Sequence, residues 1–343
     1  YKGMVNPFPV SRPVTPSQTF PMPFLLVGYD PDFGVPDIHQ WNFTVEQLLP
    51  KGLVARVAYQ GSAGRDLFQA SEINAAVYGP GATIANTNSR RPRHEFTKLT
   101  FPGTYGISNY HALVTSVEKR FASGLTFLAG LSWQKSSDTV SSEAFEFSVG
   151  TYPYNSRMLD YGPSDYSRKI RFTGSFNYQF PEPRSSVLRY TLGGWQLNGI
   201  VALQSGAPLN FGLGYDNSFS GIGSDRVDST GDWRLDSSRS HAEKIDKFFN
   251  TAAFRPGAPG TFGTLGRNAG IGPGSIQQDL SLFKAVSMPF SEHHKIEFRA
   301  EFFNLLNVVN LNNPTTNYSS KLFGEITSAG DSRIIQLGLR YSF

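Results

Sequence analysis

One segment of the sequence contains four aspartates, and their side chains could hold a metal ion. The segment DRVDSTGDWRLD contains Asp225, Asp228, Asp232 and Asp236. Carboxylate oxygens are ligands that Ca²⁺ prefers, but this spacing does not match the loop of an EF-hand. Aspartate is also a common turn former. We therefore treat the four residues as weak calcium candidates, keep ordinary turns as the alternative interpretation, and assign no metal to the chain.

A second pattern that could do chemistry lies in the segment KIEFRAE. Lys295, Glu297, Arg299 and Glu301 carry charges at every second position, and positioned carboxylates can act as general acid and base. In an extended chain, residues two apart point to the same side. A hydrated row of charges along one side of a strand explains this pattern more simply than catalysis does.

Motifs of known catalytic sites are absent from the sequence. It contains no G-x-S-x-G elbow, no H-E-x-x-H pair, no Walker loop and no G-x-G-x-x-G, and the glycines of GTFGTLG are spaced differently. His293 and His294 are adjacent, so on a strand they would point to opposite sides and would not share a metal. We therefore expect neither enzymatic activity nor a cofactor.

Composition indicates a folded chain that is rich in β-structure. The 343 residues include 34 Gly, 28 Phe, 22 Pro and 15 Tyr, and only 17% are charged, which is unlike a disordered chain. The net charge of +4 is small, and the one basic run, residues 90–94, is too short for a nucleic-acid face. We expect no nucleic-acid partner. Since the sequence has no cysteine, disulfides and thiolate chemistry are excluded.

Neither a spanning helix nor a secretion signal is visible in the sequence. No stretch approaches the roughly 18 apolar residues that suggest a spanning helix, and no charged segment followed by an apolar one begins the chain. The first residue is Tyr1 and not Met. We therefore expect the chain to be a piece of a longer precursor.

Nine segments alternate apolar and polar residues with a period of two, which predicts β-strands. In the last of them, SRIIQLGLRYSF, Leu337, Leu339 and Tyr341 lie on one side. We expect strands of about ten to fourteen residues, close to the length that a tilted strand needs to cross a membrane. The segments are centred on residues 40–46, 53–60, 110–121, 125–134, 170–180, 195–204, 279–282, 295–302 and 333–343.

The connections between these segments alternate between short and long. This arrangement is typical of an outer-membrane β-barrel, which has short periplasmic turns and long extracellular loops. A soluble antiparallel sandwich is the alternative, but its strands usually have about five or six residues, and long loops on one edge alone are unusual in a compact domain. The short links are 49–52, 122–124, 181–191 and 286–294, and the long ones are 62–106, 136–165, 206–275 and 305–331.

The charged row in KIEFRAE indicates which face of the predicted barrel meets lipid. An Arg or Lys that faces lipid near the bilayer midplane costs about 2–4 kcal/mol, so the row should face the lumen and Phe298 should face lipid. Polar lumen side chains are the candidates for lining a substrate passage, namely Arg171, Asn177, Gln196, Asn198, Lys295, Glu297, Arg299 and Glu301. Aromatic residues near the strand ends should form interfacial girdles, namely Trp41, Tyr59, Trp133, Tyr178, Phe180 and Trp195.

The number of segments suggests part of a barrel. Bacterial single-chain barrels have even numbers of strands, whereas nine are predicted here. We therefore interpret residues 1–343 as one partial outer-membrane β-barrel domain. Residues 1–38, which are rich in Pro, would be the remainder of an extracellular loop, and residues 39–343 would be the C-terminal strands and loops.

Several blocks of the sequence carry a family resemblance. They include GPSDYSRKIRFTGSFNYQFP, GGWQLNGIVALQSGAPLNF, IEFRAEFFNLLN and FGEITSAGDSRIIQLGLRYSF. These blocks resemble the C-terminal barrel of Oar-like TonB-dependent outer-membrane receptors, in order from about Asp37 to Phe343. The resemblance implies an all-β, antiparallel up-and-down barrel of about 22 strands in the outer membrane of a Gram-negative-type bacterium. It also implies ligand import through a receptor whose plug domain is absent from this chain.

The resemblance gives the last strand a role and names partners. Tyr341 and Phe343 match the terminal aromatic signal that the outer-membrane assembly machinery reads. The expected partners are that machinery, outer-membrane lipid and lipopolysaccharide, the TonB energy-coupling complex through the missing plug, and a ligand that the sequence does not identify. A passive channel, a structural barrel and a soluble β-sandwich binding module are the alternatives.

Overall fold

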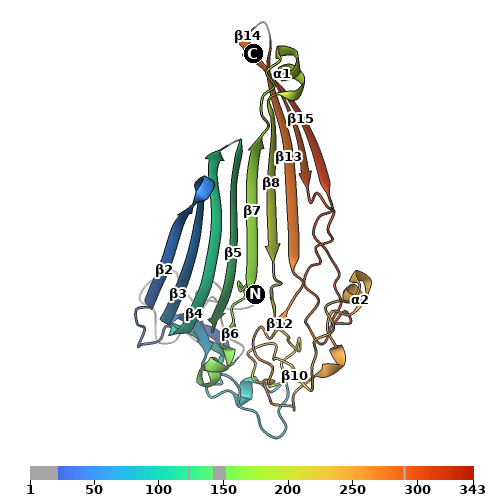
Figure 1. The fold of residues 1–343 in the computed structure, drawn as a ribbon. Helices are drawn as coiled ribbons and strands as arrows, with labels where there is room; N and C mark the ends of the chain where they lie inside the picture. The colour runs from blue at the N-terminus through green and yellow to red at the C-terminus, as the bar shows by residue number, and fades with distance from the viewer. Residues whose placement is uncertain (1–21, 123, 142–151, 289–290) are drawn as a thin grey trace, which may run out of the picture.

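A single antiparallel sheet dominates the structure, a computed structural model that describes residues 22–122, 124–141, 152–288 and 291–343. Within these ranges, nine long strands follow one another in chain order across the sheet, with β2 and β15 at its two edges (Figure 1). This confirms the nine predicted strands and their up-and-down order. The strands are β2 (Asp37–Leu49), β3 (Leu53–Glu72), β4 (Phe96–Ala122), β5 (Leu125–Asp138), β7 (Ile170–Gln179), β8 (Trp195–Gln204), β13 (Ser275–Met288), β14 (Ser291–Phe303) and β15 (Ile334–Ser342).

Shorter elements accompany this sheet. β1 (Phe24–Val27) pairs in parallel with β4, and β6 (Gly162–Pro163) pairs with β5. In the described ranges, no helix is long and apolar enough to cross a membrane. The remaining elements are β9 (Pro208–Leu209) with β12 (Gly270–Ile271), β10 (Asp228–Ser229) with β11 (Phe254–Arg255), α1 (Ser186–Leu192), α2 (His241–Asp246), and the 3₁₀ turns η1 (Pro50–Gly52), η2 (Asn88–Arg90), η3 (Tyr154–Asp160) and η4 (Thr251–Ala253).

The short connections lie at one end of the sheet and the long loops at the other, at the top and bottom of Figure 1. The turn at η1 illustrates the tight links: Lys51 and Gly52 adopt positive φ angles of 65° and 71°, which reverse the chain within three residues. One predicted tight link, 181–191, is wrong, because the chain between β7 and β8 contains the helix α1.

The predicted loop 62–106 is also wrong in extent. β3 and β4 remain paired as far as Glu72 and Thr100, with register shifts between Gly64 and Phe68. The loop itself is therefore residues 73–95. The continued pairing gives backbone N–H and C=O groups hydrogen-bond partners that a loop would have to find in water. This favours the longer strands, although side chains no longer alternate clearly between apolar and polar there.

The predicted boundary at residue 38 needs a similar correction. β2 begins at Asp37, and β1 occupies Phe24–Val27, so the described part of the 1–38 segment is partly strand. Residues 1–21 lie outside the described part of the chain.

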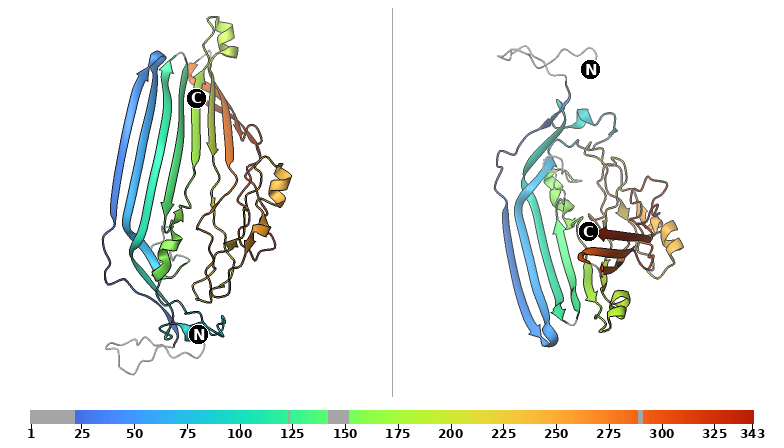
Figure 2. Two further views of the ribbon diagram at one scale, coloured as in Figure 1. Left: turned by 60° about the horizontal axis from the view of Figure 1, so that its bottom comes forward. Right: turned by 90° about the horizontal axis from the view of Figure 1, so that it is seen from above.

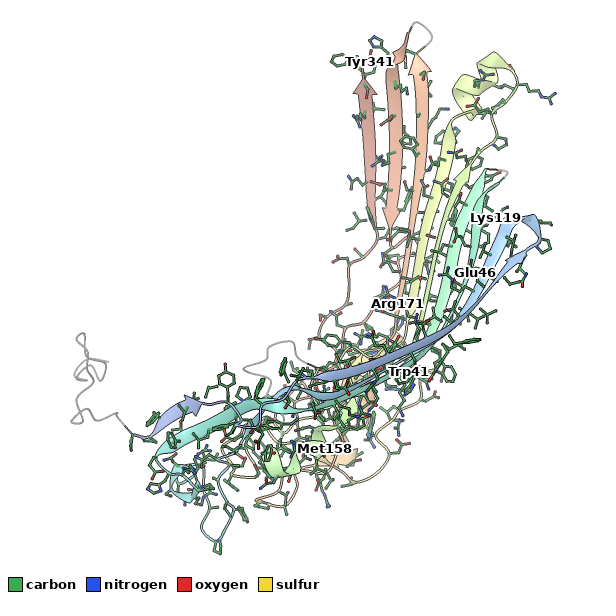
Figure 3. The ribbon with its side chains drawn as sticks, turned by 90° about the vertical axis from the view of Figure 1, so that its left-hand side faces the viewer. Trp41, Glu46, Lys119, Met158, Arg171 and Tyr341 are labelled. Atoms are coloured by element: carbon green, nitrogen blue, oxygen red, sulfur yellow. The ribbon has the colours of Figure 1, made fainter. Side chains whose placement is uncertain are left out.

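The sheet is curved, with β2 and β15 on opposite sides of the arc (Figure 2). Side chains project from both of its faces along its whole length, with Tyr341 at the short-turn end and Met158 among the long loops (Figure 3). Directly opposed residues in an antiparallel pair share a face. The register can therefore assign each side chain to one face.

The long loops contain their own hydrophobic core. Leu209, Phe211, Leu213, Val227, Phe249 and Phe254 are buried together, with Phe323 packed against them. The rings of Phe211 and Phe254 are 4.8 Å apart between centroids, and those of Phe249 and Phe323 are 5.0 Å apart. This core joins loop 205–274 to loop 304–333, so these segments form a packed cap and not a set of separate hairpin tips.

Candidate functional site: the polar face and the outer loops

The eight predicted lumen residues all lie on one face of the sheet, here called the polar face. Asn177 is opposite Asn198, which is opposite Ser281, which is opposite Glu301. The other predicted residues lie an even number of positions from these residues on the same strands, so they share the same face. Glu297, for example, is opposite Arg340. The register thus places Arg171, Asn177, Gln196, Asn198, Lys295, Glu297, Arg299 and Glu301 together.

Hydrogen bonds and an ion pair join side chains on this face, both within a strand and between strands. The Asn177 side-chain amide donates to Asn198 Oδ1 at 2.6 Å, and Gln196 donates to the same oxygen at 3.0 Å. At the other edge, Arg56 Nη2 lies 2.6 Å from Glu46 Oε2. These pairs keep polar groups partnered along a surface that the alternation alone predicts to be wet.

Apolar residues interrupt the polar face at positions that the sequence pattern did not predict. Leu128 is opposite Ser175, which is opposite Ile200. Leu128 is 50% exposed and Ile200 is 56% exposed, and Leu48 on the same face is 69% exposed. A signal was present, since these residues occupy polar-side positions of the period-two pattern, but single apolar exceptions carry little weight in one sequence.

The opposite face, here called the apolar face, carries the expected hydrophobic rows. Ile296, Phe298 and Ala300 stand opposite Tyr341, Leu339 and Leu337. Its aromatic side chains gather near the two strand ends, with Trp41, Tyr59 and Trp133 toward the long loops and Trp195, Tyr178 and Phe180 toward the short turns.

Two residues near the short turns complete the apolar face. Lys284 is opposite Trp195 and Phe298, but its Nζ reaches the Thr191 carbonyl oxygen at 2.5 Å and lies over the Trp195 ring. This is how a lysine keeps its ammonium near water while its stem covers apolar surface. The terminal Tyr341 hydroxyl lies 2.6 Å from His294 Nδ1, whereas the side chain of His293 falls outside the described residues.

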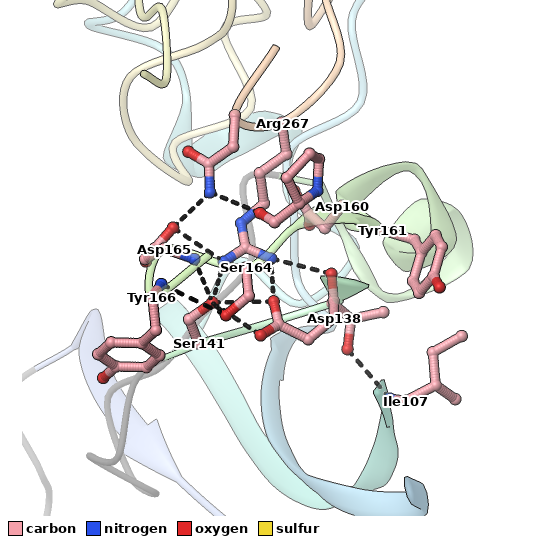
Figure 4. A network of polar contacts seen from close by, with 12 residues as sticks. Ile107, Asp138, Ser141, Asp160, Tyr161, Ser164, Asp165, Tyr166 and Arg267 are labelled. Carbon is pink, nitrogen blue, oxygen red and sulfur yellow. Dashed lines mark hydrogen bonds and ion pairs between the residues drawn. The ribbon is translucent and has the colours of Figure 1, made fainter. Parts of the chain in front are cut away.

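A polar network ties the long loops to the end of β5 (Figure 4). The Arg267 guanidinium donates to Asp138 Oδ1 at 2.5 Å, to Ser141 Oγ at 2.7 Å and to Asp165 Oδ1 at 3.1 Å. Asn268 donates to the Pro163 carbonyl oxygen at 2.7 Å. Loop 205–274 is thereby fixed against residues 138–141 and 163–165.

A buried ion pair makes a second link between the same loops. The side chains of Arg226 and Asp160 are each 2% exposed, and they contact one another directly. Arg226 also donates to the Leu159 carbonyl oxygen at 3.0 Å and lies over the Tyr152 ring. Burial lowers the pKa of Arg226, and the Asp160 charge opposes that effect.

The four aspartates considered as calcium candidates are not assembled into one site. Asp225 accepts from Ser218 N at 2.6 Å, Asp228 accepts from Thr264 N at 2.9 Å, Asp232 pairs with Arg234, and Asp236 accepts from Ser238. Among the residues that the structure describes, no group of three or more His, Asp or Glu is placed to hold a metal ion. Asp225, Asp232 and Asp236 contact residues of their own turns, whereas Asp228 joins two distant parts of loop 205–274.

Asp225 has an unusual environment among these four. Its side chain is buried, and burial raises its pKa to about 6, while hydrogen bonds from Ser218 oppose the rise and the Asp216 charge adds to it. Asp216 itself accepts from the Gly221 amide at 2.8 Å. Residues 216–226 also contact loop 73–95. Arg91 donates to the Gly221 carbonyl oxygen, and the Ala76 amide donates to the Ser220 carbonyl oxygen.

A cavity of about 480 Å³ opens between loops 205–274 and 304–333. Arg234 lies 4.7 Å above the Trp233 ring, and Arg239 donates to the Lys247 and Phe248 carbonyl oxygens. α2 supplies Lys244, and its N-terminus is fixed by a capping box between Ser240 and Glu243. The cavity therefore combines an aromatic wall with cationic groups, none of which the sequence pattern predicts to form a site. Its lining includes Trp233, Arg234, Asp236, Arg239, His241, Lys244, Phe248, Val309 and Leu311.

Comparison with protein families matches residues 1–336 to the family described as outer membrane beta barrel domain. Among solved structures, the outer membrane transporter YddB from Escherichia coli aligns with a TM-score of 0.53 at 12% identity. That alignment covers 94% of this chain and 34% of the transporter. At this identity the likeness concerns the fold, and the chain spans about a third of the solved protein.

A second solved structure is the FrpB iron transporter from Neisseria meningitidis (F3-3 variant), with a TM-score of 0.43 and 11% identity over 93% of this chain and 33% of that one. A comparison with curated proteins found no match.

Proposed function

We propose, from the premise that the chain belongs to the outer membrane beta barrel domain family, that it is part of the wall of a TonB-dependent transporter. The chain lies in the outer membrane, with its long loops outside the cell and its short turns in the periplasm. In this proposal the outer loops capture a ligand, which then passes along the polar face toward the periplasm. The ligand is not catalytically changed, and the chain itself carries no cofactor.

The observation that carries the proposal is the cavity between the two long loops. A hydrophobic core joins the two loops that form its walls, and the buried Arg226–Asp160 pair ties loop 205–274 to the turn at Tyr154–Asp160, so the cavity walls are preorganised. Preorganised walls reduce the entropy cost of binding a ligand. A receptor that captures a dilute ligand needs a preorganised binding cavity, whereas a purely structural barrel does not.

The exposed apolar residues on the polar face support the presence of an inner domain. Leu48, Leu128 and Ile200 stand in one row across the lumen side, and at least half of each side chain is exposed. Grouped exposed apolar side chains are typical of a protein contact. A plug seated inside the completed barrel would cover them. That plug would also carry the contact with the TonB energy-coupling complex.

The remaining proposed partners follow from the same location. The apolar face contacts outer-membrane lipid and lipopolysaccharide, and the assembly machinery reads the terminal strand with Tyr341 and Phe343. We propose no nucleic-acid partner.

Energy dependence distinguishes active import from a passive channel. Cells that express the protein carrying this chain are compared with deletion cells in a defined medium, with and without a protonophore, and the medium is analysed by mass spectrometry. Active import predicts at least one solute that only expressing, energised cells remove. Removal that is equally fast with the protonophore would establish the channel instead, and equal media from both strains would contradict uptake altogether.

A further inference from the structure

The cavity between loops 205–274 and 304–333 is lined by residues of two kinds. Phe248, Val309 and Leu311 are apolar, and so are the neighbouring glycines and proline of residues 272–274. Residues 233–244 add basic side chains to the same lining. A molecule that fills the cavity therefore meets apolar surface and positive charge together.

Arg234 is presented to the cavity by Trp233. Its guanidinium lies 4.7 Å above the centre of the Trp233 ring, and that ring packs against the hydrophobic core, 5.3 Å from the Phe211 ring. The Arg234 guanidinium also lies 3.5 Å from Asp232 Oδ1, but both side chains are about 70% exposed. Such an exposed pair contributes little to stability, so Arg234 can exchange this partner for an anionic group in the cavity.

Lys244 is the second basic group, and α2 directs it into the cavity. His241 lies three positions before Lys244, so the two side chains share one side of the helix, and both line the cavity. Within the described residues, the Lys244 ammonium forms no hydrogen bond or ion pair. The helix itself is fixed to loop 304–333, because Ile326 N donates to the Ile245 carbonyl oxygen at 2.9 Å.

The carboxylate that lines the cavity does not cancel these two charges. Asp236 accepts from the Ser238 amide at 2.8 Å, and this bond, the Ser238 hydroxyl and the nearby Arg239 and Lys244 charges hold the pKa of Asp236 below its ordinary value. Arg239 balances the Asp236 charge, and its guanidinium is occupied by backbone carbonyl oxygens, including those of residues 247 and 248. The charges of Arg234 and Lys244 therefore remain for a ligand.

We propose that this cavity binds a small carboxylic acid whose carboxylate is joined to an apolar body. The carboxylate is held by Arg234 and Lys244, and the body lies against Phe248, Val309 and Leu311. A planar guanidinium can bind a carboxylate through two parallel hydrogen bonds, and a volume of about 480 Å³ is usual for a small-molecule site. This names the substrate class of the receptor and rests on the proposed function for its role in uptake.

Isothermal titration calorimetry of the detergent-purified, full-length protein tests the substrate class. The probes are benzoate, cinnamate, indoleacetate and octanoate, and the comparison compounds are their primary amides, which keep the shape and lose the charge. We expect at least one acid to bind at a single site, and its amide to bind at least tenfold more weakly. Replacing both basic residues, R234Q with K244Q, should weaken binding of that acid by roughly tenfold or more, the factor expected for one charge-assisted hydrogen bond.

A matched control and a cavity-filling variant complete the test. R255Q with K247Q removes the same two charge types outside the cavity lining, in β11 and directly after α2, and should bind the acid as the wild type does. V309W fills the apolar part, leaves both basic residues in place, and should lose the acid. Folding of each variant is checked by its heat-dependent gel migration. Equal affinity for acid and amide, no binding of any acid, full binding in R234Q with K244Q or in V309W, or an equal loss in the control would each overturn the site.

The calorimetry and the uptake experiment fail independently of one another. Energy-dependent removal of a solute by cells whose purified protein binds none of the acids would overturn the substrate class and retain transport. Binding of an acid that depends on Arg234 and Lys244, in a protein whose cells remove no solute, would retain the site and overturn transport.

Discussion

Gln336 and Leu337 are neighbours in β15 and lie on opposite faces of the sheet. Gln336 stands opposite Glu301, and Leu337 stands opposite Ala300. Leu337 is 69% exposed, as expected of an apolar side chain that faces lipid. The pair therefore offers two adjacent positions that should respond in opposite ways to the same substitution.

Leu337→Arg should destabilise the folded protein in lipid by about 2–4 kcal/mol, because an arginine near the midplane faces hydrocarbon. The measurement is chemical unfolding in vesicles, followed by tryptophan fluorescence.

Gln336→Arg is the matched control for that prediction. Its guanidinium would face Glu301 on the polar face, so we expect a change below about 1 kcal/mol. If the two variants were equally destabilised, the assignment of the faces would be wrong.

Asp160→Asn should loosen the outer loops. It leaves the Arg226 charge buried without its partner, and breaking one side of a buried ion pair typically costs about 3–5 kcal/mol. Hydrogen exchange measured by mass spectrometry should show lost protection in loop 205–274. Replacing both residues, Asp160→Met with Arg226→Met, should restore much of it, and unchanged exchange in Asp160→Asn would refute the link.

The turn around Asp225 should be more stable in mild acid. The folded-state pKa of about 6 lies above the ordinary value of 3.8, so the folded turn binds the proton more tightly than the unfolded one. This contribution is fully present below pH 3.8 and is lost as the pH rises through about 6. After correction for intrinsic rates, residues 216–226 should exchange more slowly at about pH 4.5 than at about pH 7.5. Asp225→Asn should remove that difference, and a wild type without it would contradict the argument.

Two glycines on the apolar face should respond differently to alanine. A Cβ at Gly199 would lie 2.2 Å from the Phe176 ring, whereas one at Gly174 would lie 3.5 Å from its nearest neighbour. Gly199→Ala should cost about 1–3 kcal/mol through overpacking, and Gly174→Ala should be close to neutral. The free energy of unfolding in vesicles is measured for both variants. If both variants lost the same stability, the Phe176 ring would not need the space above Gly199.

The period-two pattern was sufficient to predict the nine strands, their order and the face of each charged residue in KIEFRAE. It failed beyond Gly61 in β3 and in the paired part of β4. Gly61 and Gly64 in β3 and Gly103 and Gly106 in β4 remove the side-chain signal there, while backbone pairing continues. α1 was missed because the short segment Ser186–Leu192 lacks a clear helical period.

The contacts of the outer loops were beyond reach of the sequence for a different reason. Arg226 and Asp160 are 66 positions apart, and Phe211 and Phe323 belong to different loops. No local pattern relates such residues, because their contact depends on how the sheet brings the loop ends together. The cavity with Trp233 and Lys244 has the same origin.

The central claim is that one face of this sheet contacts lipid and the other surrounds a water-filled space. Since the chain has no cysteine of its own, single spin labels can be placed at Phe298, Leu337 and Arg299 in the protein reconstituted in bilayers. Collisions with dissolved oxygen should be frequent for the labels at Phe298 and Leu337, and collisions with a water-soluble nickel complex should be frequent for the label at Arg299. The reverse pattern would contradict the assignment of both faces.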